Sequence, residues 1–193
     1  MRSIVVAALV AAGAATPLLA QEAPSGKAPF TGARVEGLAG WDRVQNGGHD
    51  DGVHYGLGAG YDFQTGMGVA GIEGEFSDST ARECSGSRTA ADPRLCARAG
   101  RDLYVGGRIG TVVGGNMLLY AKAGYTNAQA KLTSDDGTAR TRLGKTNLDG
   151  VRVGAGVEYA VGPNAFVKTE YRYSNYEKGF SRHQVVGGFG FRF

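Results

Sequence analysis

From Phe30 to the end of the chain, apolar and polar residues alternate with a period of two in one short segment after another. The clearest example is Val53–Phe63, where valine, tyrosine, leucine, alanine and phenylalanine alternate with histidine, glycine and aspartate. Such alternation is typical of a β-strand whose two faces meet different surroundings. The segments with this pattern are Phe30–Trp41, Val53–Phe63, Val69–Ser77, Asp102–Val113, Leu118–Ala128, Val151–Tyr159, Phe166–Asn175 and Arg182–Phe193. The sequence therefore predicts eight strands.

The connections between these segments alternate in length. Three are tight and rich in turn-forming residues: Gln64–Gly66, Gly114–Asn116 and Gly162–Asn164. Those between them are polar: Asp42–Gly52, Asp78–Arg101, Thr133–Thr146 and the shorter Tyr176–Phe180. Short turns at one end and long loops at the other are typical of outer-membrane barrels, with the short turns on the periplasmic side.

The polar face carries glycine and charge together, which favours a narrow enclosed lumen over a solvated surface. Glycine on an exposed strand face costs backbone entropy, whereas in a lumen it leaves room for long side chains. Acids and bases on this face are nearly matched, as an enclosed space requires. The expected lumen charge network is Arg34, Glu36, Glu73, Glu75, Arg108, Lys122, Arg152, Glu158, Lys168, Glu170, Arg172 and Arg192.

The apolar face carries aromatic residues in two bands. One band, at the ends with short turns, is Tyr61, Phe63, Tyr159, Phe191 and Phe193; the other is Trp41, Phe76, Tyr125 and Tyr173. Two bands separated by aliphatic residues match the interfacial girdles of a membrane barrel. The predicted fold is an all-β, eight-stranded antiparallel up-and-down transmembrane β-barrel over residues 30–193.

The first 29 residues lack this pattern. A basic start, an apolar run over Ile4–Ala15 and a small residue at Ala20 predict a signal peptide over residues 1–20, cleaved before Gln21. The run is too short to cross a bilayer as a helix. Residues 21–29 form a short polar leader. We therefore expect export to the outer membrane of a Gram-negative bacterium.

The last residues carry a resemblance. The ending Phe189–Phe193, with phenylalanine at positions 189, 191 and 193, is similar to the C-terminal signature of outer-membrane barrels. Together with Leu119–Tyr125 and Val167–Tyr173, it makes the chain resemble small barrels of the porin family or opacity type, related in architecture to the transmembrane domain of OmpA. The resemblance implies that Phe189, Phe191 and Phe193 form an assembly signal for the barrel-assembly machinery.

Cys84 and Cys96 both fall in the longest expected loop. An exported chain meets an oxidising compartment, so we expect a disulfide between them. Two weaker patterns are Ser181 with His183, which lack an obvious acid partner for catalysis, and the acid pairs Asp50–Asp51 and Asp135–Asp136, read as solvated turns rather than cation ligands.

The formal net charge of +3 comes from dispersed basic residues, so no nucleic-acid partner is expected. We also expect no catalytic residues, no metal and no cofactor, and partners among outer-membrane lipid and lipopolysaccharide. The predicted function is a structural surface barrel whose loops are available for interaction or adhesion. The first alternative is a small non-specific pore, and the less favoured one is a lipid-A-modifying barrel enzyme.

Overall fold

The computed structural model describes residues 29–193, apart from 46–48, 81, 88, 90–91, 136, 138–139 and 178–179. The expected signal peptide, residues 1–20, lies outside the described part. Residues 21–28 of the expected leader lie outside it as well. Signal-peptide cleavage therefore stays a prediction. Among the described residues, no helix has the length and apolar character needed to cross a membrane.

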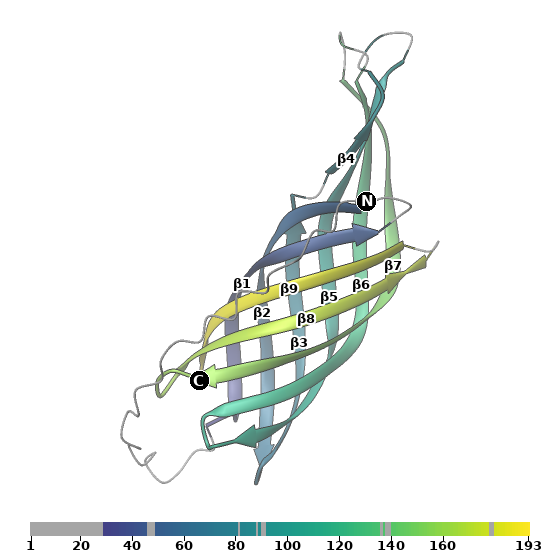
Figure 1. Ribbon diagram of the computed structural model, residues 1–193. Helices are drawn as coiled ribbons and strands as arrows, with labels where there is room; N and C mark the ends of the chain where they lie inside the picture. Colours follow the sequence, from purple (N-terminus) through teal and green to yellow (C-terminus); the bar gives the residue numbers. More distant parts are fainter. Residues whose placement is uncertain are drawn as a thin grey trace, which may run out of the picture.

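In the part of the chain that the structure describes, nine strands form one antiparallel sheet, and eight of them close into a barrel (Figure 1). The strands are β1 (Gly32–Gln45), β2 (His49–Thr65), β3 (Gly68–Ser79), β4 (Arg82–Ser85), β5 (Arg94–Val113), β6 (Met117–Asp135), β7 (Arg140–Ala160), β8 (Ala165–Tyr176) and β9 (Phe180–Arg192). Each barrel strand pairs with its neighbours in sequence, β9 pairs with β1, and β3 pairs with β5 past the short β4. The predicted eight-stranded up-and-down barrel is confirmed.

The predicted faces are also confirmed. On β2, Leu57 is 68% exposed and Phe63 is 63% exposed, whereas His54 and Asp62 are fully buried. Outward side chains with this apolar character fit a lipid surround, and the buried polar ones line the lumen. The first expected strand started too early, because β1 begins at Gly32 and Phe30 lies buried in the turn before it.

The long connections are not the loops that the sequence indicated. Much of the expected loops Asp42–Gly52, Asp78–Arg101 and Thr133–Thr146 is strand, and β4 lies wholly within the second of them. Here we define the blade as β4 with residues 94–101 of β5, 128–135 of β6 and 140–149 of β7, which project past the ends of β8 and β9 (Figure 1). Because both faces of the blade lie beyond the lipid, its residues need no apolar–polar alternation, and the pattern that marks a strand is lost.

Inside the barrel, long side chains lie opposite glycines on the neighbouring strand. Register partners of this kind are Arg34 with Gly60, Glu36 with Gly58, Lys168 with Gly188 and Arg172 with Gly154. A Cβ at position 58 would lie 2.7 Å from Glu36 Oε1, so the missing side chain leaves the space that the carboxylate fills. Glycine on the charged face is therefore what allows a narrow lumen to hold so many long side chains.

A paired substitution tests this arrangement. A Cβ at the inward Gly60 would lie 2.6 Å from the Ile72 carbonyl oxygen and 2.9 Å from Arg34 Nη2. We expect Gly60→Ala to lower the free energy of unfolding by about 1–3 kcal/mol through overpacking. Gly74→Ala is the control, because its Cβ would meet the Tyr104 carbonyl oxygen at 3.7 Å, an ordinary contact. Urea unfolding in vesicles compares the two; equal stabilities would contradict the packing argument.

Candidate functional site

The lumen holds a network of buried ion pairs. The structure places all twelve residues of the expected lumen charge network in the interior, where none is more than 6% exposed. Four buried charged residues of the lumen were missing from that set: Asp42, Asp62, Asp102 and Arg182. With them, the described residues of the barrel interior include eight bases and eight acids.

A signal for the four was present in the sequence. Asp62 lies on the polar face of the clearest alternating segment, and Asp102 and Arg182 are the first residues of two others. Asp42 continues the even-numbered parity of Arg34 and Glu36 by one step past the expected strand end. Applying the period of two to the whole of each segment, and one residue past Trp41, finds all of them.

At the end of the barrel with short turns, Asp62 accepts hydrogen bonds from three arginines. Its carboxylate lies 3.0 Å from Arg34 Nε, 2.5 Å from Arg108 Nη2 and 2.8 Å from Arg192 Nη2. These arginines come from β1, β5 and β9. The Asp62 side chain of β2 therefore links strands on opposite sides of the lumen. Glu158 adds a second carboxylate, which forms ion pairs at 2.9 Å with both Arg108 Nη1 and Arg192 Nη2.

The middle level is built around Lys122. Its Nζ lies 2.7 Å from Glu73 Oε1, 2.7 Å from Glu75 Oε1 and 3.0 Å from Glu170 Oε1. The same ammonium is 4.4 Å from the centroid of the Tyr104 ring, within the range of a cation–π contact. Each buried charge at this level therefore has more than one partner, as burial requires.

At the loop end, Asp102 and Asp42 bind the remaining arginines. Asp102 accepts hydrogen bonds from Arg152, from Arg182 at 3.0 Å and from the Thr126 hydroxyl at 2.7 Å. Asp42 pairs with Arg182 as well and accepts a 2.6 Å hydrogen bond from Ser79. The network thus continues from one end of the lumen to the other.

Beneath the charges, apolar side chains fill the end of the lumen with short turns. Phe30, Val69, Val112 and Leu118 form a buried cluster with the Tyr120 ring. The Arg192 guanidinium lies 5.3 Å from the centroid of the Phe30 ring, between the two layers. These side chains form a packed apolar layer beneath the paired charges, as in a protein core.

The charges are divided unevenly along the chain. The lumen-facing charges of β1–β3 comprise five acids and one base: Glu36, Asp42, Asp62, Glu73 and Glu75, with Arg34. Those of β7–β9 comprise five bases and two acids: Arg152, Lys168, Arg172, Arg182 and Arg192, with Glu158 and Glu170. The two ends of the chain therefore present opposite net charge to the lumen.

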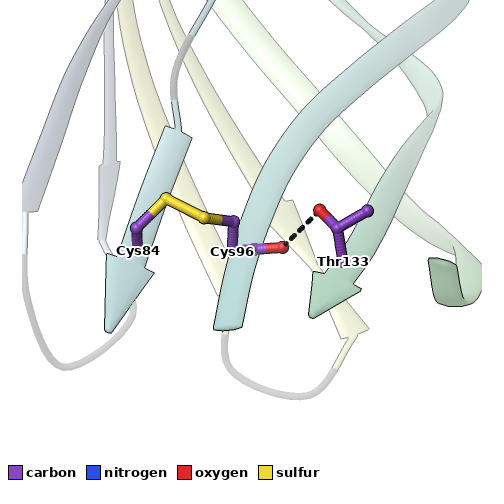
Figure 2. The surroundings of a disulfide bond; sticks show 3 residues. All are labelled: Cys84, Cys96 and Thr133. Atoms are coloured by element: carbon purple, nitrogen blue, oxygen red, sulfur yellow. Dashed lines mark hydrogen bonds between the residues drawn. A yellow bond between two sulfur atoms is a disulfide. The ribbon is translucent and has the colours of Figure 1, made fainter. Parts of the chain in front are cut away.

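The expected disulfide is present in the blade (Figure 2). Cys84 of β4 and Cys96 of β5 are register partners with Cα atoms 4.1 Å apart. The Cys96 carbonyl oxygen also accepts a 3.3 Å hydrogen bond from Thr133 on β6, as Figure 2 shows. The disulfide therefore holds the four-residue β4 against the longer strands of the blade.

The disulfide gives a direct chemical prediction. Mass spectrometry of the non-reduced protein is expected to find the peptides containing Cys84 and Cys96 linked, because their register places the thiols side by side. Alkylation of both thiols without a reductant would contradict it. The double variant Cys84→Ser/Cys96→Ser should retain barrel stability and lose protease resistance in the blade, since the bond lies outside the barrel.

The weaker patterns can be placed only in part. His183 Nδ1 lies 2.7 Å from the Tyr171 hydroxyl, and its ring is 4.9 Å from the Tyr173 ring centroid, so aromatic residues are its neighbours. Asp135 accepts a 3.1 Å hydrogen bond from the Gly137 amide, consistent with a turn. The side chains of Asp50, Asp51 and Asp136 lie outside the described part. Within that part, no group of three or more metal-binding side chains occurs.

The three phenylalanines of the expected assembly signal lie on the outer face. Phe189, Phe191 and Phe193 are 50%, 45% and 62% exposed. The Phe193 amide donates a 2.8 Å hydrogen bond to the Ala33 carbonyl oxygen, which fixes the chain end beside the start of β1. Recognition by the assembly machinery stays a prediction.

A closed antiparallel barrel with an apolar exterior and a paired-charge interior defines an integral β-barrel protein of the outer membrane. The chain belongs to the outer membrane protein beta-barrel domain family, whose model matches residues 4–193. It is 32% identical to a 22 kDa outer membrane protein of Rhizobium leguminosarum bv. viciae over 155 residues, which cover 72% of this chain and 67% of that protein.

A 25 kDa outer-membrane immunogenic protein of Brucella ovis is 28% identical over 139 residues, 70% of this chain and 61% of the relative. The chain thus spans less than two thirds of that relative's length. Two solved structures share the fold. Neisserial surface protein A (TM-score 0.58, 17% identity) matches 84% of this chain and 98% of its own. The attachment invasion locus protein of Yersinia pestis (TM-score 0.56, 18% identity) matches 84% and 99%.

Proposed function

We propose that the barrel is a non-conducting anchor that presents the blade at the cell surface for binding to anionic partners. The observation that carries the anchor role is the filled lumen: eight bases pair with eight acids above a buried apolar layer. An eight-stranded barrel has room for side chains rather than for a channel. In barrels of this class, the end with long connections faces outward, which places the blade outside the cell.

The charge of the blade suggests its partner. Segments 82–101 and 128–149 contain nine of the 21 Lys and Arg residues and five of the 18 Asp and Glu residues. The rest of the chain is close to neutral, so the net positive charge is concentrated where the fold projects farthest (Figure 1). A positive patch attracts sulfated or phosphorylated saccharides. The Yersinia pestis protein of the same fold was crystallised with a heparin analogue, a ligand of this charge class.

Planar-bilayer recordings test the anchor role. The folded protein is expected to give no regular conductance steps, because paired charges and the Phe30 layer fill the lumen. Reproducible single-channel steps would refute a closed anchor and favour the small pore. A separate measurement addresses the enzyme alternative. Lipid A from cells that express the protein should keep its mass.

Heparin affinity chromatography of the folded protein tests the binding role. Arg94 and Arg101 are exposed residues of β5 in the blade. The variant Arg94→Glu/Arg101→Glu is expected to elute at lower salt than the wild type, because it reverses two charges. Arg94→Lys/Arg101→Lys retains the charge and should elute with the wild type. Identical elution of all three proteins would remove the blade from the proposal.

The chain end supplies a prediction about biogenesis. We infer that Phe193 is read during assembly, since it is exposed at the end of the last strand and completes the alternating phenylalanines. Deleting Phe193, or replacing it with aspartate, should reduce the heat-modifiable folded form in outer-membrane fractions and leave unfolded chain in the periplasm. Phe193→Tyr retains the ring and serves as the control. An unchanged folded yield on deletion would show that the residue is dispensable.

A further inference from the structure

Four basic residues occupy one row across the blade. In the register of the sheet, Arg82 of β4 pairs with Arg98 of β5, Arg98 pairs with Lys131 of β6, and Lys131 pairs with Lys145 of β7. Positions directly opposite each other in antiparallel strands share one face of the sheet. We call these four positions the basic row. Because neighbouring strands lie about 4.8 Å apart, the row is about 14 Å long and runs across the strands.

The acids of the blade on this face lie two rows away from the basic row. Toward the tip, Asp135 lies in register between Arg94 and Arg140. Toward the barrel, Asp149 accepts a hydrogen bond from the Tyr125 hydroxyl. The rows in between contain the disulfide, Thr133 and Arg142 on one side, and Gln129 and Asn147 on the other. Among the register positions of the blade that the structure describes, those next to the basic row on its own face therefore include no acid.

The opposite face of the blade carries no matching set of bases at this level. The two rows that flank the basic row belong to that face, and Glu83 is the one charged residue among their described positions. Bases that served only solubility would be expected on both faces. Like charges directly opposite each other destabilise a sheet, so a row of four has a cost within the protein. A ligand that supplies the opposite charge accounts for the row.

The disulfide explains how the row keeps the base that β4 contributes. Arg82 is opposite Arg98, so charge repulsion opposes the pairing of a strand that has only four residues. Cys84 and Cys96 form the next register pair on the same face, and their bond joins β4 to β5 covalently (Figure 2). The disulfide therefore holds the Arg82 position in line with the other three.

The basic row lies beyond the lipid headgroups. Lys131 is six residues past the girdle residue Tyr125, which is about 20 Å along β6. Even at a strand tilt of about 45°, the row is then about 14 Å above the girdle, whereas the headgroup layer is about 5–8 Å thick. The blade accordingly projects past the ends of β8 and β9 (Figure 1). The phosphate of a lipid headgroup therefore does not reach the row, and the ligand comes from outside the membrane.

We propose that the basic row binds one chain of a sulfated polysaccharide, which lies across the strands of the blade. This inference rests on the binding role proposed for the blade and names the positions that carry it. A line of four cations matches a linear polyanion, whose charges recur along its length, better than a compact anion that reaches only part of the row. Single-stranded nucleic acid is also linear, but its recognition combines cations with aromatic side chains on which bases stack. The blade contains no aromatic residue, which favours the polysaccharide.

The length of the ligand tests the linear geometry of the site. The folded protein in detergent micelles is titrated with heparin oligosaccharides of increasing length and with sucrose octasulfate, which is compact. Affinity should rise with length until the chain spans the row and should then level off. A heparin oligosaccharide with as many sulfates as sucrose octasulfate should bind more tightly, and equal affinities would overturn the linear site. Single-stranded DNA of matched charge is the third probe, and binding as tight as that of heparin would overturn the assignment to a polysaccharide.

Two pairs of substitutions, matched in charge, test the row itself. Arg98→Gln/Lys131→Gln removes two bases of the row, and Arg94→Gln/Arg101→Gln removes two bases of the blade outside it. For the first pair, the slope of log affinity for heparin against log salt should fall by about two, through lost counterion release. Its affinity should fall about fivefold, and the second pair should show less than half of each change. Equal effects of the two pairs would overturn the row and leave the blade as a diffuse binding surface, whereas no binding by the wild type would refute the proposed function as well.

A double-mutant cycle tests the part played by the disulfide. Cys84→Ser/Cys96→Ser should weaken the binding of long heparin chains as much as Arg82→Gln does, because both remove the Arg82 charge from the line. Arg82→Gln should then have no further effect in the variant without the disulfide. Heat-modifiability confirms that the barrel of each variant is folded. Losses that add in the triple variant would show that the disulfide does not act through Arg82 and would overturn its role in positioning the row.

Discussion

Replacing Asp62 with alanine is expected to lower the free energy of unfolding of the barrel by about 3–5 kcal/mol, the range for breaking a buried ion pair by removing one partner. The Asp62 carboxylate accepts hydrogen bonds from Arg34, Arg108 and Arg192, and it is fully buried. Its removal leaves three guanidinium groups close together with less negative charge between them. Urea unfolding of the protein in lipid vesicles, followed by Trp41 fluorescence, measures the loss.

The matched control is Asp92→Ala, which removes an exposed carboxylate in the connection between β4 and β5. Its loss should change the free energy of unfolding by less than about 0.5 kcal/mol, as is usual for surface positions. If Asp62→Ala were as mild as Asp92→Ala, the network would not contribute to barrel stability as the geometry indicates.

An arginine in place of Ala155 is expected to destabilise the barrel by about 2–4 kcal/mol, the cost of a base near the bilayer midplane. Ala155 is exposed on the outer face of β7, midway along the part of that strand that pairs with β8. Thr141→Arg places the same side chain on the same strand, at an exposed position in the blade, and should cost little. The same urea unfolding assay compares the two.

A loss of stability does not by itself show that the outer face contacts lipid, so a labelling experiment completes this test. Cysteines at positions 153, 155 and 157 should react with a lipid-soluble reagent, whereas one at the buried position 152 should not. Reaction at neither set, with the protein in the soluble fraction, would contradict a membrane location for this face.

The strands and their faces could be predicted from the sequence because lipid and lumen impose opposite demands at every second residue. Residues 53–63 show this alternation throughout, and β2 contains them with its faces as expected. The blade could not be predicted in the same way, because its strands have water on both sides. The pairing of the blade strands depends on backbone hydrogen bonds, which do not determine the polarity of the side chains.

The sequence predicts which residues belong to the charge network more completely than it predicts which of them form ion pairs. Parity assigns a residue to the lumen, but only the register and curvature of the closed sheet bring Asp62 to arginines on β1, β5 and β9.

The uneven division of lumen charge along the chain has a consequence for how the barrel forms. Until β9 pairs with β1, the sheet is open, with an acid-rich face on its first three strands and a base-rich face on its last three. Each group repels itself and attracts the other, so curling the sheet lowers its electrostatic energy. Two ion pairs, Arg182 with Asp42 and Lys168 with Glu36, join residues more than 130 positions apart and exist only after closure. The order of charges along the chain thus supplies an attraction between its two ends that grows as they approach.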